Sequence, residues 1–269
     1  MVEKGVKVDV ILTSPPYNTA RLCKTQRSIE NYENRYDIHL DNMTPEQYAD
    51  WTVKLFEAFD SVLSPNGIVI YNISYGTENP ESYLQATNAV VSRTPFTMGD
   101  KVIWKKKCAL PNNVSPNKLT RITEDVFIYC RRKEYKTYRA NKNVKSVSRT
   151  GQKYYENVFN LIEAANNDGP CALNKATFST DLVMQLLKIY APADATVYDP
   201  FMGTGTTALG CEKYGSKDMK CYGSELSENQ VAYANNRIED WRKAQVKQPS
   251  LFPEFEEAEE EQVEDGNEF

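Results

Sequence analysis

The segment Ser14-Pro15-Pro16-Tyr17 places a hydroxyl group, two rigid residues and an aromatic ring in consecutive positions. Because successive prolines restrict the backbone, the Ser14 hydroxyl and the Pro15 carbonyl become fixed hydrogen-bond acceptors. Such acceptors suit an amine conjugated to a ring, whose delocalised lone pair makes it a poor nucleophile. Accepting both N–H hydrogens would help the nitrogen become pyramidal and stabilise its developing positive charge, and Tyr17 could stack on the ring. The structural alternative is a strand-ending turn with a packed aromatic ring.

A glycine-rich segment, Asp199-Pro200-Phe201-Met202-Gly203-Thr204-Gly205-Thr206, lies between a predicted strand and a predicted helix. Gly203 and Gly205 let the backbone turn sharply and approach a ligand, and the amides that begin the helix face an anionic group. Glu225 follows Gly203 by 22 residues and ends the next predicted strand. An acidic residue at this spacing typically binds ribose hydroxyls. These features predict a nucleotide-type cofactor site, and a purely structural glycine turn is the alternative.

Both segments follow short apolar strands in the predicted order of elements. Helices are expected from Thr44-Pro45 to about Val62, over 81–92, over 180–190 and after Gly205, and strands over 8–12, 68–73, 100–104, 124–130 and 196–199. This alternation predicts a doubly wound, mainly parallel α/β sheet with helices on both faces. Between 131 and 169 the periodicity fades and the polarity rises, so no regular element is predicted there.

The net charge of −5 combines two opposed regions. Residues 254–269 contain nine acidic residues and no Lys or Arg, and removing those nine charges leaves the other residues at +4. Between Lys101 and Arg149, fourteen Lys and Arg residues face three acidic ones, a local balance of +11. Because Tyr and Trp are interleaved with these cations, the basic stretch favours a polyanionic partner. The acidic run has the composition of a disordered tail.

Several classes of protein are disfavoured by composition. No apolar run approaches the ~18 residues of a membrane helix, and the first residues lack the apolar region of a signal peptide. The six cysteines form no Cys-x-x-Cys pair, which fits a reducing interior compartment. The single histidine, His39, argues against histidine-based catalysis, and with no cysteine pair the sequence predicts no metal site.

On its two motifs the sequence resembles the DNA amino-methyltransferases that use S-adenosylmethionine. Their catalytic motif, Asp/Asn/Ser-Pro-Pro-Tyr/Phe, corresponds to 14–17, and their Phe-x-Gly-x-Gly motif to 201–205. The catalytic motif comes first, as in the β group of the family, and the resemblance covers most of residues 5–240. It implies a Rossmann-like methyltransferase domain over 1–247, with a target-recognition region inserted at about 101–170, followed by a tail over 248–269.

The resemblance also implies roles for individual residues. Ser14, Pro15, Pro16 and Tyr17 would be catalytic. S-adenosylmethionine would lie against Asp199, Pro200, Phe201, Gly203, Gly205 and Thr206, with Glu225 on its ribose. Phe178 corresponds to the aromatic residue that contacts adenine in the family's His-Pro-x-x-Phe segment, although Asn174 and Lys175 replace the usual His and Pro.

The implied reaction is direct methyl transfer to the exocyclic nitrogen of a base flipped out of duplex DNA, without a covalent enzyme intermediate. Serine at the first motif position favours N4 of cytosine over N6 of adenine. The expected phosphate contacts are Lys105, Lys106, Lys107, Arg131, Arg132 and Lys133. We therefore expect a DNA-associated protein of the bacterial cytoplasm, or of a phage-infected cell, and dimers occur in this family.

The segment Gln248-Pro249-Ser250-Leu251-Phe252 resembles the short motif by which bacterial DNA-associated proteins bind the replication sliding clamp. Gln248 would contact a polar rim, and Leu251 and Phe252 an apolar pocket. The alternative is that these residues fold back onto the domain.

Other functions remain open from the sequence. N6-adenine methylation, RNA or protein-glutamine methylation, and a catalytically silent DNA-binding subunit are all compatible with parts of the pattern. The silent subunit is suggested because few residues precede the first strand, where the family usually carries an acidic strand end. Pro170-Cys171 and Glu156-Asn157-Val158 resemble motifs of the cytosine-C5 methyltransferases, but in reversed order.

Overall fold

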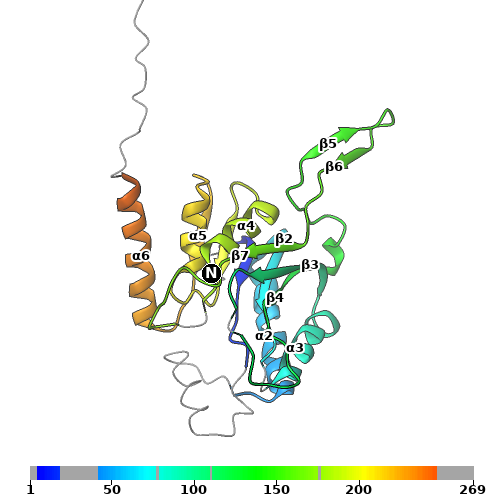
Figure 1. Cartoon of the computed structure of the whole chain (residues 1–269). Coiled ribbons are helices and arrows are strands. Elements are labelled where there is room, and N and C mark those ends of the chain that lie inside the picture. The colour runs from blue at the N-terminus through cyan, green and yellow to red at the C-terminus, as the bar shows by residue number, and fades with distance from the viewer. Residues whose placement is uncertain (1–4, 19–41, 77–78, 110, 175–176, 247–269) are drawn as a thin grey trace, which may run out of the picture.

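A seven-stranded sheet forms the centre of the computed structural model, which describes residues 5–18, 42–76, 79–109, 111–174 and 177–246 (Figure 1). Its strands, in spatial order, are β7 (Leu161–Ala164), β3 (Phe96–Lys106), β4 (Thr123–Arg131), β2 (Leu63–Ile73), β1 (Val8–Thr13), β8 (Thr196–Asp199) and β9 (Lys220–Gly223). Neighbouring strands are parallel except where β4 pairs with β2 and β3. The carboxyl ends of the other six strands therefore share one edge of the sheet with the start of β4.

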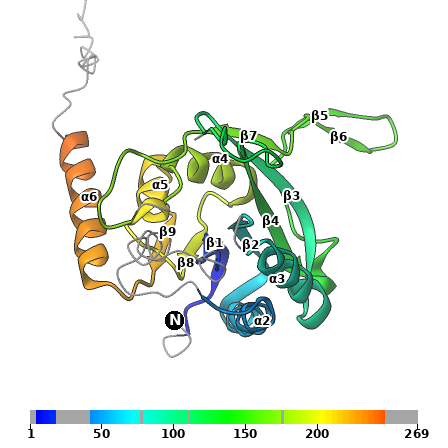
Figure 2. The same ribbon diagram turned by 60° about the horizontal axis from the view of Figure 1, so that its bottom comes forward.

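Helices cover both faces of this sheet (Figure 2). α2 (Pro45–Val62) and α3 (Pro80–Arg93) lie on one face, and α4 (Thr180–Tyr190) and α5 (Thr206–Tyr214) on the other, with α6 (Glu228–Val246) beyond α5. α2 begins as the sequence predicts, because Thr44 and Gln47 form a reciprocal capping box and Pro45 occupies the first turn. The doubly wound α/β fold is thus confirmed.

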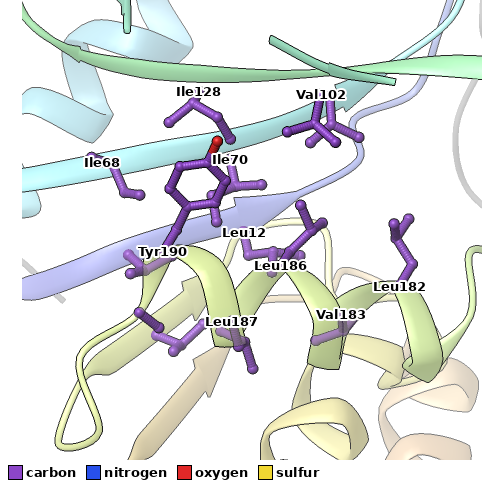
Figure 3. Packing of buried hydrophobic residues seen from close by; sticks show 14 of the residues in the cluster. Leu12, Ile68, Ile70, Val102, Ile128, Leu182, Val183, Leu186, Leu187 and Tyr190 are labelled. Carbon is purple, nitrogen blue, oxygen red and sulfur yellow. The ribbon is translucent and has the colours of Figure 1, made fainter. Parts of the chain in front are cut away.

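Two apolar cores hold the layers together. Figure 3 shows side chains of β1, β2, β3 and β4 facing Leu182, Val183, Leu186, Leu187 and Tyr190 of α4. On the opposite face, Phe56 of α2 packs edge-on against Tyr71, Phe96 and Tyr129. Because helices cover both faces, central strands such as β2 are apolar at consecutive positions rather than alternating.

The structure differs from the sequence prediction mainly between 131 and 169. This region holds the short 3-10 helix η2 (Arg132–Glu134), a hairpin of β5 (Val144–Val147) and β6 (Lys153–Tyr155), and then β7. The hairpin projects away from the body (Figures 1 and 2). Both of its strands are exposed along their whole length, so they lack the one-sided apolar pattern that reveals a strand in a sequence.

The segment Ser64–Gly67, between the predicted helix and the predicted strand over 68–73, lies within β2 as an irregularity. The partner of Val8 is Leu63 but the partner of Val10 is Ile68, and Asn66 has a positive φ of 61°. No helix in the described part of the chain is long and apolar enough to cross a membrane.

Candidate active site

The corner formed by Ser14–Tyr17 leaves the carboxyl end of β1 and is held from several sides. Tyr48 of α2 donates its hydroxyl hydrogen to the Pro16 carbonyl at 2.6 Å. The next residue, Asn18, is 1% exposed and has a φ of 55°. Its side-chain amide donates to the Met43 carbonyl at 2.8 Å and accepts from the Met43 amide at 2.7 Å. These bonds fix the backbone that carries the Ser14 and Pro15 acceptors.

The glycine turn follows the neighbouring strand β8. Gly203 and Gly205 have φ values of 53° and 81°, a region in which side chains are strained. Glu225, two residues beyond β9, accepts the Gly203 amide hydrogen at 2.8 Å through Oε2. Its other carboxylate oxygen accepts from the amides of Leu226 and Ser227. The 22-residue spacing therefore brings an acidic side chain across the glycine turn.

Asp199 joins the corner to the glycine turn. Its Oδ1 accepts from Thr13 Oγ1 at 2.7 Å and from the Phe201 amide at 3.0 Å, and its Oδ2 accepts from Thr207 Oγ1 at 2.5 Å. Burial raises the pKa of this carboxyl group to about 6, although the three hydrogen bonds oppose that shift. Because three protein donors surround the carboxylate, we infer that Asp199 positions the glycine turn. Direct contact of Asp199 with a cofactor stays a prediction.

The neighbouring groups suit an amino-acid-bearing nucleoside. A Cβ atom on Gly203 would lie 3.1 Å from Asn174 Nδ2 and 3.4 Å from Gln230 Oε1, so the polar ends of both side chains reach the glycine turn. Phe178 packs, partly buried, against the α4 core, and Phe201 lies 5.8 Å from Trp51 between ring centroids. Backbone amides, a carboxylate and side-chain amides thus surround the turn. These groups fit the carboxylate, ammonium and ribose groups of S-adenosylmethionine.

A polar cluster that the sequence analysis missed surrounds the Ser14 corner. Tyr17 OH donates to Glu124 Oε2 at 2.9 Å, and Ser14 Oγ lies 2.9 Å from the same hydroxyl. Asn72 Nδ2 donates to Tyr17 OH at 2.6 Å, and Lys106 Nζ pairs with Glu124 Oε1 at 2.6 Å. We call Ser14, Tyr17, Asn72, Glu124 and Lys106 the corner network. Two features of the sequence point to this network: Asn72 is a side-chain amide near the end of an apolar strand, and Glu124 is an acidic residue within the basic stretch.

The predicted phosphate contacts separate into two groups. Lys105, Lys106 and Lys107 end β3 or follow it, at the same edge as the Ser14 corner, and pair with Glu163, Glu124 and Asp181 at 2.6, 2.6 and 3.5 Å. Lys106 also lies 5.1 Å over the Trp104 ring, and its side chain is only 22% exposed. Its ammonium group therefore contacts the corner network, and a phosphate contact by Lys106 stays a prediction.

Arg131 is not a phosphate contact, because its guanidinium group is used inside the protein. It bonds to the Asp60 side chain at 2.5 Å and to the carbonyls of Asp60, Leu63 and Ser64. Arg131 ends β4, which runs antiparallel, so it lies at the edge opposite the Ser14 corner, and Arg132 and Lys133 follow directly. Arg132 bonds to the carbonyls of Val91 and Phe96. The cluster 131–133 therefore lies away from the Ser14 corner, and phosphate contacts by Arg132 and Lys133 stay a prediction.

Some predicted features lie outside the described residues, namely His39 and the tail with Gln248, Leu251 and Phe252. Of the cytosine-C5-like residues, Cys171 contacts Tyr233 of α6, whereas Glu156 pairs with Asn143 at the base of the hairpin.

Comparison with known proteins decides the family. The model of the N6/N4 DNA methylase family matches residues 8–236. The chain belongs to the N6/N4 DNA methylase family. The resemblance and the methyltransferase fold are thereby confirmed, and with them S-adenosylmethionine as the cofactor.

Individual relatives within the DNA methylases are distant. The type II methyltransferase M.ScaI of Streptomyces caespitosus is 24% identical over 86% of this chain and 75% of its own. The orphan methyltransferase M.BamHII of Bacillus amyloliquefaciens is 24% identical over 87% of this chain and 89% of its own. Among solved structures, the cytosine-N4-specific PvuII DNA methyltransferase has a TM-score of 0.62 at 16% identity, and the match covers 88% of this chain and 86% of that one. The M1.HpyAVI–SAM complex has a TM-score of 0.56 at 20% identity, covering 88% and 91%.

Proposed function

We propose that this DNA methylase transfers the methyl group to N4 of cytosine in duplex DNA. The observation that carries the proposal is the Thr13–Asp199 hydrogen bond of 2.7 Å, which ties the amine-accepting corner to the glycine turn. S-adenosylmethionine, when bound, supplies an electrophilic methyl group on a sulfonium centre. The chain's own residues then have to hold the target amine in line with that methyl group.

The Ser14 corner would perform this task by hydrogen bonding. Ser14 Oγ and the Pro15 carbonyl accept the two N–H hydrogens of the amine, and the Tyr17 ring stacks on the flipped base. Because Tyr48 and Asn18 already fix the corner, little reorganisation accompanies the reaction. No covalent intermediate is involved, since the amine itself attacks the methyl group.

The preference for cytosine rests on two supports. The first is serine rather than aspartate at position 14, the first position of the catalytic motif. The second is the likeness in fold to a solved methyltransferase described as cytosine-N4-specific. N6-adenine methylation is the alternative within the same chemistry.

We further propose that DNA lies along the edge that carries Ser14, Lys105 and Lys107, and that the β5–β6 hairpin, which lies between the end of β4 and the start of β7, makes a separate contact with a groove. The hairpin presents Lys145, Arg149 and Lys153 together with exposed Tyr154 and Tyr155. A two-stranded ribbon of this kind fits the major groove. Clamp binding through Gln248, Leu251 and Phe252, and a homodimer, stay predictions for which the described residues offer no test.

The proposal is tested by identifying the methylated nucleoside. Unmethylated duplex DNA is incubated with the protein and methyl-labelled S-adenosylmethionine, digested to nucleosides and analysed by mass spectrometry. Label in N4-methylcytosine is the expected result. Label in N6-methyladenine would retain the enzyme class and overturn the target base, label at C5 of cytosine would overturn the chemistry, and no label would favour a silent subunit.

A further inference from the structure

The corner network fixes the direction of each of its hydrogen bonds. A carboxylate only accepts, so the single Tyr17 hydroxyl hydrogen points at Glu124 Oε2, 2.9 Å away. An amide nitrogen only donates, so Asn72 Nδ2 gives a hydrogen to the Tyr17 oxygen at 2.6 Å. With its own hydrogen committed, the Tyr17 oxygen can only accept from Ser14 Oγ at 2.9 Å. The Ser14 hydrogen therefore points toward Tyr17, and one of the two Ser14 lone pairs accepts from Asn72 Nδ2 at the long distance of 3.4 Å, which leaves the other for a ligand.

This direction matters for an amine substrate. A serine that donated its hydrogen to the amine would occupy the lone pair that has to attack the methyl group. A serine whose hydrogen is turned away offers its own lone pairs, which accept an N–H hydrogen and leave the nitrogen free. The chemistry proposed for Ser14 thus requires the second arrangement, which the network enforces.

We infer that Glu124 is a positioning residue of this methyltransferase: acting through Tyr17, it turns the Ser14 hydroxyl away from the target amine and makes Ser14 Oγ an acceptor. The inference deepens the proposed function and rests on it. The elements make the arrangement possible because β1, β2 and the antiparallel β4 are neighbours, so the start of β4 meets the ends of the other two.

Lys106 holds the Glu124 carboxylate in this orientation. Its Nζ is 2.6 Å from Oε1, which leaves Oε2 directed at Tyr17 and within 3.0 Å of Asn72 Nδ2. The Glu124 side chain is only 11% exposed, so water competes little for these bonds. All the contacts of Glu124 described above point toward the corner rather than toward a ligand in solution.

The test uses Glu124→Gln, whose amide can donate to Tyr17 and release the fixed direction. We expect the single-turnover rate of methyl transfer to fall by ~10- to 100-fold, the scale of losing one preorganised polar contact. The dissociation constants for S-adenosylmethionine and DNA should stay within about twofold, because the side-chain contacts of Glu124 described above lie within the corner network. Glu163→Gln is the matched control, since it removes an ion pair of the same 2.6 Å length from neighbouring Lys105 without touching the corner.

A double-mutant cycle separates positioning from other roles. If Glu124 acts only through Ser14, adding Glu124→Gln to Ser14→Ala should lower the rate of methyl transfer by less than about twofold. The inference would be overturned if the rate reductions of the two single variants multiplied in the double variant, or if Glu124→Gln alone left the rate unchanged. Tyr17→Phe is the second variant, because it keeps the ring but removes the hydroxyl that links Glu124 to Ser14, without altering a buried charge. We expect the same fall in the rate of methyl transfer, and the same lack of a further fall when it is combined with Ser14→Ala. Absence of methylation by the unmodified protein would instead reject the proposed function.

Discussion

A single carboxylate, Asp199, links the two motifs on which the site depends. Three donors from Thr13, Phe201 and Thr207 surround it, and it is 1% exposed. Burial nevertheless dominates, because it raises the pKa of Asp199 to about 6 from an ordinary value of 3.8. The charged form is therefore less stable in the folded protein than in the unfolded chain. Above pH 6, where Asp199 is mainly charged, its burial therefore lowers the free energy of unfolding.

Replacing Asp199 by Asn should expose this cost as a pH dependence of stability. Between about pH 4 and pH 6 the folded protein keeps a proton that the unfolded chain has lost, so the contribution of Asp199 is greatest below pH 4 and is lost as the pH rises through 6. Asn does not titrate, and either threonine hydroxyl can reverse to accept from its amide. The free energy of unfolding of Asp199→Asn, relative to the unmodified protein, should rise by about 2 kcal/mol from pH 4 to pH 7. Urea unfolding at several pH values measures it; a difference that does not change with pH would refute the assignment.

At the scale of elements, the glycine turn is tied to α6 through close packing. Gly205 begins α5 with a φ of 81°, and a Cβ atom there would lie 2.7 Å from Ala234 Cβ and 3.1 Å from Ala234 Cα. Arg237, further along α6, donates to the Thr204 carbonyl at 3.3 Å. The position of the cofactor turn therefore depends on α6, which is otherwise largely exposed.

Gly205→Ala should thus destabilise the protein more than backbone strain alone explains. Gly215→Ala is the control: Gly215 ends the same helix with a φ of 77°, but the nearest atom to its Cβ would be 3.8 Å away. We expect the control to lose about 1 kcal/mol and Gly205→Ala to lose an additional ~1–3 kcal/mol from overpacking, by urea unfolding. Calorimetry should also show weaker cofactor binding in Gly205→Ala alone. Equal losses in both variants would contradict the packing argument.

The elements that the sequence predicts well are those with one clear periodicity or cap. The Thr44–Gln47 capping box and the run Ile68–Ile73 are examples. The corner network was not predictable in this way, because Asn72 and Glu124 lie 55 and 107 positions from Tyr17. Asn72 meets it because β2 is the parallel neighbour of β1, and Glu124 because β4 runs antiparallel beside β2. Strand order of this kind is not encoded in local periodicity. The same topology places Arg131 at the edge opposite the Ser14 corner.

At the scale of the molecule, three cationic side chains, Lys145, Arg149 and Lys153, lie on an element that projects from the compact body. The β5–β6 hairpin leaves the body near β7 (Figure 2), and its base is closed by a 3.0 Å hydrogen bond from the Glu156 amide to the Asn143 carbonyl. Few contacts tie the hairpin to the sheet, so it can be removed without opening the core. The sequence indicated the charge of this region but not its shape.

Joining Asn143 to Glu156 through a two-residue Asn-Gly turn should therefore weaken DNA binding while leaving thermal stability and cofactor affinity unchanged. The deletion removes Lys145, Arg149 and Lys153. We expect the slope of log affinity against log salt to become shallower by about 2–3, as for three lost phosphate contacts. Changing the same three residues to Gln should reproduce the change in slope with the hairpin retained. An unaltered slope in both proteins would show that DNA binds elsewhere.

The most direct test of the whole account compares Ser14→Ala with the unmodified protein in two measurements on one preparation. Single-turnover transfer of a labelled methyl group to duplex DNA should fall by ~100-fold or more, because one fixed acceptor for the amine is lost. The dissociation constant for S-adenosylmethionine, measured by calorimetry, should stay within about twofold. A variant that methylates DNA at the unmodified rate would contradict the assignment of the corner as the site of amine activation.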